Sequence, residues 1–271
     1  MTVEYSNETL KKVDELRPID DAFFRLLAKD KAACQEIINT LTGGSFEVLS
    51  VTPQKVETSA FREVVLDVLC RTNDGRLVNI EVQKGNGNND VKRCRFHASA
   101  ITANHTDKGT DFEDVPDVII LYITEYDVLG SNQAVTVCET CALTGDEYKP
   151  VNDGVKIFYA NTEVKEDSKK GELLELFLQN NATSNSKFPN FCERIKYYKE
   201  DRKGRLAMCK IIEEYAQDAS RKSIISISRK NYLQGLNYEF IIQNIAEELN
   251  VSEKEATKIF ENEVANDNVL A

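Results

Sequence analysis

Three polar residues of the segment Val64 to Lys84 could do chemistry together: Asp67, Glu81 and Gln83. Two carboxylates that face each other among apolar residues resist burial while ionised, and each raises the pKa of the other. A divalent cation relieves both problems, because Mg²⁺ takes one or two carboxylates together with waters and phosphate oxygens. A metal-bound water is a nucleophile for phosphodiester hydrolysis, and the amide of Gln83 could orient it. The segment therefore predicts a Mg²⁺ or Mn²⁺ site.

These side chains meet only if the segment folds as a β-hairpin in one register. The loop 73–75, Asn-Asp-Gly, separates two runs of β-branched and apolar residues, and Gly in the last position suits a type I turn followed by a left-handed residue. Such a loop pairs Thr72 with Arg76 and places Asp67 opposite Glu81. Because side chains alternate along a strand, one face carries the polar groups and the other face is apolar. The apolar face contains Val64, Leu66, Val68, Cys70, Val78, Ile80 and Val82.

Two alternatives to this interpretation stay open. A two-residue Asp-Gly loop would shift the register by one and place the carboxylates on opposite faces, although the coherent apolar face favours the first register. An ordinary hairpin with a solvated outer face would show the same pattern without binding a metal, since antiparallel hairpins are often exposed on one side.

The elements around the hairpin predict an α/β or α+β fold with a central mixed β-sheet flanked by helices. Apolar residues at helical spacing and helix start and stop signals predict helices over residues 8–16, 22–41, 90–105, 171–179 and 190–215. Two further amphipathic helices are expected within residues 239–265, with a break near residues 250–252. Strands outside the hairpin are expected over residues 46–51, 117–124, 134–139 and 155–159. We therefore expect one domain over residues 1–215 and a helical C-terminal extension over residues 216–271.

Composition is that of a globular protein, with 271 residues, 41% hydrophobic and 29% charged. The longest apolar run, residues 118–123, is far shorter than the ~20 residues that span a bilayer. The first residues lack the hydrophobic core of a signal peptide. We therefore expect a cytoplasmic protein that does not enter a membrane. Seven scattered cysteines argue against a disulfide framework, and two histidines give little support to a zinc site or a Ser-His triad.

The net charge of −11 counts against non-specific binding to nucleic acid, which usually needs a basic surface. Residues 84–95 nevertheless hold four basic residues and one acidic residue. Lys84, Arg93 and Arg95 could therefore contact a phosphate backbone, although a solvated helix face gives the same pattern. Arg93 and Arg95 are two residues apart on the expected helix and do not share a face. Lys84 points away from Gln83 unless a bulge turns it.

Asp67, followed after a turn by Glu81-Val82-Gln83, resembles the core motif of the PD-(D/E)xK nuclease superfamily. The resemblance is closer to the recombination-promoting nucleases, also described as PD-(D/E)xK family transposases, in which Gln commonly replaces the superfamily Lys. Histidine 97 stands where that family usually has Tyr. The similarity covers roughly residues 17–215. The segments that carry it include Asp20-Asp21-Ala22-Phe23-Phe24-Arg25, Leu66-Asp67-Val68, Val118 to Ile123, Asn79-Ile80-Glu81-Val82-Gln83, Arg93-Cys94-Arg95-Phe96-His97 and residues 151–158.

The resemblance implies a restriction-endonuclease-like fold and a Mg²⁺- or Mn²⁺-dependent DNA endonuclease associated with recombination or transposase-like elements. Asp67 and Glu81 would be metal ligands, and Gln83 would take the position of the catalytic Lys. Asp21 would be an additional acidic residue on the first helix of the domain. Arg95 would support the site or hold a phosphate.

Three questions stay open at this point. Asp20 competes with Asp21 for a place in the site, and an Asp at a helix start also serves as a cap worth ~1 kcal/mol. The missing Lys and the net acidity also suit a DNA-binding or regulatory protein that keeps the fold with weak or no turnover. The apolar stripe of the C-terminal helices packs either on the protein itself or on a second subunit of a homodimer. The stripe comprises Phe240, Ile241, Ile245, Leu249, Ile259 and Phe260.

Overall fold

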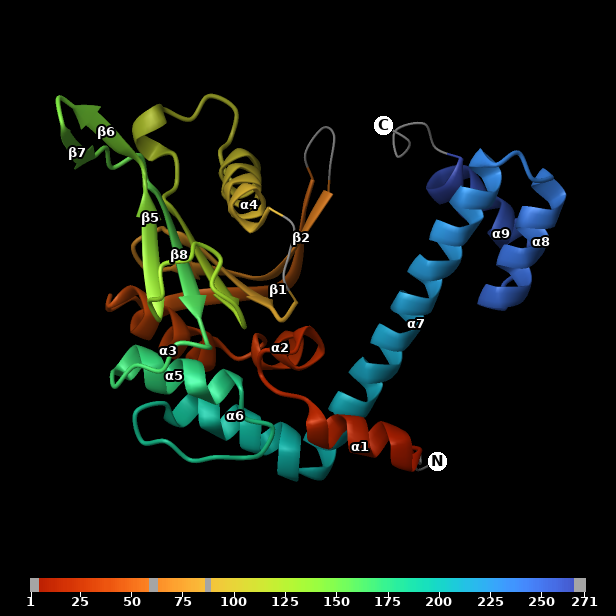
Figure 1. Ribbon diagram of the computed structural model, residues 1–271, viewed down its shortest axis with the longest axis horizontal. Helices are drawn as coiled ribbons and strands as arrows, with labels where there is room; N and C mark the ends of the chain where they lie inside the picture. Colours follow the sequence, from red (N-terminus) through yellow and green to blue (C-terminus); the bar gives the residue numbers. More distant parts are fainter. Residues whose placement is uncertain (1–4, 59–62, 86–88, 266–271) are drawn as a thin grey trace. The chain divides into compact units, whose positions relative to one another are not determined.

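A mixed six-stranded β-sheet forms the centre of the N-terminal part of the protein (Figure 1). The structure, a computed structural model, describes residues 5–58, 63–85 and 89–265. The strand order is β1-β2-β3-β4-β8-β5, with β3, β4 and β8 parallel and the other neighbours antiparallel. The strands are β1 (Val48–Thr58), β2 (Glu63–Thr72), β3 (Leu77–Gln83), β4 (Val118–Thr124), β5 (Val135–Glu139) and β8 (Val155–Asn161).

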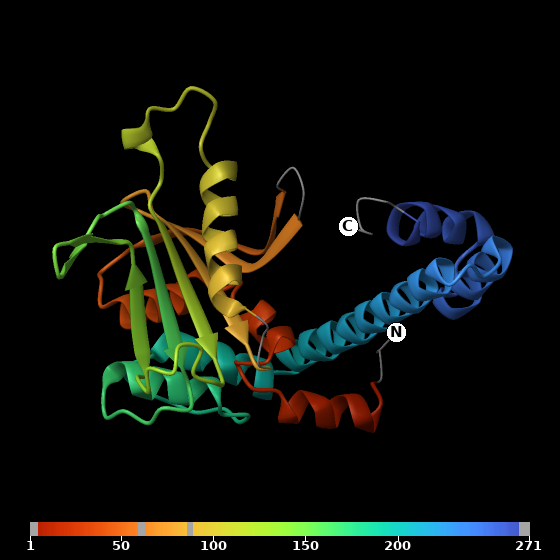
Figure 2. The same ribbon diagram turned by 45° about the horizontal axis from the view of Figure 1, so that its top comes forward.

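Helices cover both faces of this sheet, so the predicted mixed sheet flanked by helices is confirmed (Figures 1 and 2). On one face lies α4 (Asp90–Asn104), which packs against β4, β1 and β2. The other face carries α2 and α3, and α3 in turn packs on α5 and α6. These helices and the N-terminal helix are α1 (Asn7–Glu15), α2 (Asp21–Leu27), α3 (Lys31–Thr42), α5 (Lys169–Phe177) and α6 (Pro189–Glu200), and a 3₁₀ turn spans Phe112–Asp114.

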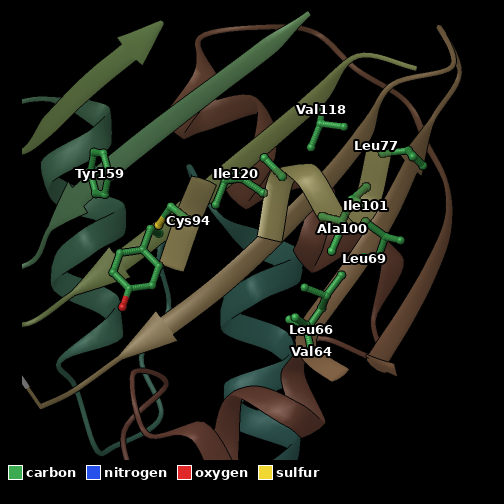
Figure 3. Close-up of a cluster of buried hydrophobic side chains, with 12 residues drawn as sticks. Val64, Leu66, Leu69, Leu77, Cys94, Ala100, Ile101, Val118, Ile120 and Tyr159 are labelled. Carbon is green, nitrogen blue, oxygen red and sulfur yellow. The ribbon is translucent and has the colours of Figure 1, made fainter. Parts of the chain in front are cut away.

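The core under α4 joins the hairpin to the parallel strands (Figure 3). Cys94, Ala98 and Ile101 of α4 pack there against residues of five strands. Every residue of β4 is buried, as expected for a parallel strand covered on both faces. All seven cysteines carry free thiols. The buried residues of this cluster are Val64, Leu66, Leu69, Leu77, Cys94, Ala98, Ala100, Ile101, Val118, Ile120, Tyr122 and Tyr159.

The alternative of an ordinary hairpin with a solvated outer face does not hold for β3. All residues of β3 except Gln83 are buried, because β3 pairs with β4 and α4 covers the same side of the sheet. Val64 and Leu66 also share one core cluster with Leu69, so strict alternation does not extend through Asp67. Gln54, which lies between the β1 partners of Leu66 and Val68, has a φ of 51°, so β1 is also distorted at this level of the sheet.

Two predicted long helices are each divided by an aspartate that begins a new helix. The single helix predicted over residues 22–41 is wrong, because the Oδ1 of Asp30 accepts a hydrogen bond from the Ala33 backbone N at 2.9 Å and caps α3. The helix predicted over residues 190–215 is wrong as well, since Asp201 separates α6 from α7 (Arg202–Leu233). The Oδ1 of Asp201 accepts from the backbone N of Lys203 at 2.8 Å.

Two strands were not predicted, and β1 and β8 are longer than predicted. The hairpin of β6 (Cys141–Thr144) and β7 (Glu147–Pro150) follows β5 and is exposed along its whole length (Figure 1). With no buried side, it lacks the apolar alternation from which a strand is recognised. The strand predicted over residues 46–51 is longer than expected, because β1 continues to Thr58 along β2.

The chain divides into two compact units, Met1–Cys209 and Lys210–Ala271, with the boundary inside α7. In the second unit α7 is followed by α8 (Tyr238–Leu249), α9 (Glu253–Ile259) and a π turn (Phe260–Val264). The predicted break between α8 and α9 is confirmed. Most of the predicted apolar stripe packs inside this unit, whereas Phe240 is half-exposed. In the described part of the chain, no helix is both long and apolar enough to cross a membrane.

Candidate active site

The hairpin has the predicted register. The backbone N of Thr72 donates to the carbonyl of Arg76 at 3.0 Å, and Val68 stands opposite Ile80. Gly75 has a φ of +86°, the left-handed conformation that the three-residue loop requires. The same register places Asp67 opposite Glu81.

The carboxylates of Asp67 and Glu81 lie where β2 and β3 stop pairing. The Oε1 of Glu81 accepts a hydrogen bond from the backbone N of Asp67 at 3.2 Å. In turn, the Oδ2 of Asp67 accepts from the backbone N of Val82 at 2.9 Å. Each carboxylate thus accepts a backbone N–H of the other strand, so both are fixed where the hairpin opens.

The buried carboxylate of Glu81 is held by two side chains that sequence reasoning did not assign to the site. The Nδ2 of Asn79 donates to its Oε1 at 2.9 Å, and the Nδ1 of the buried His97 lies 3.4 Å from the same oxygen. Spacing contained the signal for both. Asn79 is two residues before Glu81 on the same strand, and His97 is four residues after Arg93 on one helix face.

The second oxygen of Glu81 has a different environment. Its Oε2 is buried and has no hydrogen-bond partner within the described residues, and the Nη2 of Arg93 lies 3.6 Å away. A buried carboxylate oxygen without a hydrogen bond is costly, and a catalytic role or a bound ion is among the explanations for such a group in a native protein.

Burial raises the pKa of the Asp67 carboxyl well above its ordinary value, and the negative charges of Glu81 and Asp21 raise it further. The hydrogen bond from Val82 and the charge of Arg93 act in the opposite direction. Asp21, the first residue of α2, is therefore within electrostatic reach of Asp67. A cation near Asp67 would offset the repulsion that Glu81 and Asp21 exert on its carboxylate.

Asp20 and Asp21 have different roles, although they are neighbours. Asp20 occupies the N-cap position of α2, but its side chain accepts no capping hydrogen bond from the helix backbone. Its Oδ1 lies 2.7 Å from the Nζ of Lys84, and its Oδ2 accepts from the backbone N of Arg17 at 2.7 Å. Asp20 is thus engaged with Lys84 and Arg17, while the charge of Asp21 acts on Asp67.

Gln83 is fixed at the exposed side of the carboxylate pair. Its Oε1 accepts a hydrogen bond from the Nη1 of Arg93 at 3.1 Å, and its Nε2 donates to the carbonyl of Gly85 at 3.0 Å. Burial lowers the pKa of the Arg93 guanidinium, but the charge of the neighbouring Glu81 has the opposite effect. With further contributions from Tyr122, Asp67 and Cys94, the pKa of Arg93 lies above its ordinary value.

Arg95 is not brought to the carboxylates. It lines a separate cavity of about 570 Å³ between α4 and the β5–β8 part of the sheet, together with Ser99, Glu139 and Asp153. Of the three predicted DNA-contacting cations, the structure brings Arg93 to the carboxylate pair, Lys84 to Asp20 and Arg95 to this cavity.

The start of α4, which carries Arg93 and His97, is anchored by a buried carboxylate. Asp90 is the first residue of α4 and accepts hydrogen bonds from the hydroxyls of Tyr122 at 2.8 Å and Tyr126 at 3.0 Å. Sequence reasoning did not identify this anchor, because it depends on contact between α4 and the end of β4.

The donor set fits a hard divalent cation. Within residues 5–58, 63–85 and 89–265, no three His, Cys, Asp or Glu side chains form a group that could enclose a metal. Mg²⁺ does not need such an enclosure, because it keeps several waters and binds through one or two carboxylates. Asp67 and Glu81, with the buried Oε2 of Glu81 lacking a hydrogen bond, meet that requirement.

Comparison with known proteins agrees with this geometry. A sequence model of a family described as PD-(D/E)XK nuclease family transposase matches residues 19–178, more than half of the chain. The matched segment contains Asp21, Asp67, Glu81 and Gln83. No curated protein and no solved structure matches the chain. Nucleases of this superfamily typically use divalent metals, and a transposase nuclease family implies DNA as the substrate. With the match, the six-stranded mixed sheet and the carboxylates at the hairpin opening in agreement, this chain belongs to the PD-(D/E)XK nuclease family transposases.

Proposed function

We propose that this protein is a metal-dependent DNA endonuclease that hydrolyses phosphodiester bonds in recombination or transposase-like processes. The observation that carries the proposal is the arrangement of Asp67 and Glu81 at the opening of β2 and β3, with the charge of Asp21 acting on Asp67. The pair lies inside the segment that matches the nuclease family.

Asp67 and Glu81 would hold Mg²⁺ or Mn²⁺, which lowers the pKa of a bound water and neutralises charge on the phosphodiester. Asn79 and His97 keep the carboxylate of Glu81 in place. The amide of Gln83 orients the attacking water through hydrogen bonds. In hydrolysis the water oxygen bonds to phosphorus while one phosphorus–sugar oxygen bond breaks. The water loses a proton to solvent and the leaving oxygen gains one, so the products are a phosphate end and a hydroxyl end.

Lys84, Arg93 and Arg95 are proposed to contact the DNA backbone. All three are exposed and lie near the site end of β3 or on α4, and cations at such positions bind phosphate without reading sequence. A local basic surface of this kind reconciles DNA binding with the net charge of −11.

A second candidate function is DNA binding or regulation with weak or no turnover. The observation that favours it is the neutral Gln83 in the position of the superfamily Lys, next to a Lys84 that is paired with Asp20. Metal binding distinguishes the two functions, because a ligand that binds the native state raises the melting temperature. No shift with millimolar Mn²⁺, together with salt-dependent DNA binding, would favour the second function.

Cleavage of supercoiled plasmid tests the first function. Wild-type protein with Mg²⁺ or Mn²⁺ should nick the plasmid, and Asp67→Ala should abolish nicking. Asp117→Ala is the matched control, because Asp117 is a half-exposed aspartate whose ion pair is with Arg76 at the turn end of the hairpin. Nicking that survives Asp67→Ala would show that another site or a contaminant is responsible.

Domain boundaries, cellular location and assembly are also open to proposal. We propose a nuclease domain over residues 1–215 with a helical extension over residues 216–271, a cytoplasmic location and assembly as a homodimer. Sedimentation of the full chain tests the last of these, since the particle mass would be twice that of one chain.

A further inference from the structure

We propose that Arg93 supplies the positive charge that Gln83 lacks and contacts the scissile phosphate directly. This inference rests on the proposed nuclease function and assigns a catalytic residue within it. A glutamine has no charge to offer, so negative charge that develops on the phosphate during cleavage needs another group to stabilise it. No bond to Arg93 forms or breaks, and its role is to stabilise charge on the non-bridging phosphate oxygens.

The position of Arg93 carries the inference. Its Nη1 donates to the Oε1 of Gln83 at 3.1 Å, and its Nη2 lies 3.6 Å from the Oε2 of Glu81. The Arg93 side chain is 42% exposed, whereas that of Glu81 is 0% exposed. The guanidinium therefore lies between the buried carboxylate and solvent, where a phosphodiester that reaches the carboxylates would meet it.

The other nearby basic side chains are engaged elsewhere. The Nζ of Lys84 is 2.7 Å from the Oδ1 of Asp20, and Arg95 lines the cavity against β5 and β8. His97 is buried, with its Nδ1 3.4 Å from Glu81. Each would have to leave its present partner or position to reach a phosphate beside Gln83.

The chemistry of arginine suits this role. A guanidinium is always charged and presents five N–H donors in a planar fork that matches two phosphate oxygens. The contact between Nη2 and Glu81 is too long for a hydrogen bond, so Arg93 can turn this donor to a phosphate without breaking one. The anchor of Asp90 on Tyr122 and Tyr126 fixes the helix turn from which Arg93 extends.

Cleavage by matched variants tests the role. Loss of a group that stabilises transition-state charge typically slows an enzyme by ~10²–10³-fold, and we expect a loss on this scale for Arg93→Met. Adding Gln83→Lys to Arg93→Met should recover at least ~10-fold, because it restores a cation at the superfamily position. Arg76→Met is the control, since Arg76 also pairs with carboxylates, Asp74 and Asp117, but at the turn end of the hairpin.

DNA binding without metal gives a second readout. Anisotropy of a labelled duplex in EDTA measures the affinity at several salt concentrations, and each phosphate contact contributes ~0.9 to the slope of log K against log salt. Arg93→Met should lower this slope by about one contact, while Arg76→Met should leave it unchanged. Thermal melting shows whether each variant folds. If Arg93→Met does not fold, Arg93→Lys replaces it. Because Arg93→Lys keeps the positive charge, this variant should retain the wild-type salt slope.

The outcomes separate this inference from the proposed function. Wild-type cleavage rates in Arg93→Met, or an unchanged salt slope, would overturn the role of Arg93. If the wild-type protein cuts no DNA with either metal, the nuclease function fails, and the salt slope alone then decides whether Arg93 contacts phosphate.

Discussion

The two ends of the β2–β3 hairpin use the same residue types in opposite ways. At the turn end, the half-exposed Asp74 accepts from Thr72 and pairs with Arg76, and these partners outweigh desolvation and lower its pKa. At the open end, burial and neighbouring carboxylates raise the pKa of Asp67. The turn end is thus built from satisfied charges that favour folding, whereas the open end collects charges that a metal and a substrate would satisfy. Replacing equivalent groups at the two ends tests this difference.

The largest contrast is expected in catalysis. Glu81→Gln removes a proposed ligand charge while keeping the side-chain shape, and should slow cleavage by at least ~10³-fold, since a metal supplies several kcal/mol of charge stabilisation. Asp74→Asn should leave the cleavage rate unchanged. Equal rates for both variants in a plasmid assay would remove the distinction between the two ends.

The next contrast concerns the support of Glu81. Asn79→Leu deletes the buried amide that donates to Glu81 at 2.9 Å, and a buried acceptor that loses its donor costs about 1–3 kcal/mol. Thr72→Val removes a hydroxyl that donates to the half-exposed Asp74 and should cost about 1 kcal/mol, because water can replace the lost donor at Asp74. Urea unfolding measures both, and a smaller loss for Asn79→Leu would contradict the account of the buried site.

The anchor of α4 should have a smaller effect on stability. Tyr122→Phe removes one hydrogen bond to Asp90, at 2.8 Å, and should cost about 1 kcal/mol in urea unfolding. Cleavage should fall as well, because Arg93 and His97 extend from the same helix start. Unchanged cleavage in a folded Tyr122→Phe protein would show that Asp90 does not position these residues.

The smallest effects are opposite shifts in melting temperature in metal-free buffer. A carboxyl with a raised folded pKa loses stability as pH rises above its unfolded pKa, whereas one with a lowered pKa contributes stability above its unfolded pKa that is lost at lower pH. At neutral pH, Asp67→Asn should therefore raise the melting temperature and Asp74→Asn should lower it. Shifts of the same sign would contradict the comparison.

The register of the hairpin could be predicted because local rules determine it. The loop 73–75 selects a turn type, and the apolar run on each side is coherent in only one pairing. The breaks at Asp30 and Asp201 could not be recognised in the same way, because each lies within a continuous helical apolar pattern. At each position the aspartate side chain accepts a hydrogen bond from a backbone N–H of the following helix and so starts a new helix.

The site itself was only partly predictable. Asp67 and Glu81 followed from the hairpin, and the family resemblance added Asp21. Spacing places Arg93 and His97 on one face of α4. That this face contacts Glu81 depends on how α4 packs on the sheet, which local spacing does not reveal. Burial of the polar face of β3 follows from the same packing, so the alternative of a solvated outer face, which the sequence left open, does not hold for this strand.

A crystal soaked in Mn²⁺ would test the central claim most directly. The account predicts an anomalous peak at the opening of the hairpin, within coordination distance of carboxylate oxygens of both Asp67 and Glu81 and absent from Asp67→Asn crystals. A peak that avoids these two residues, or none at millimolar Mn²⁺, would contradict a metal-dependent nuclease site at this end of the hairpin.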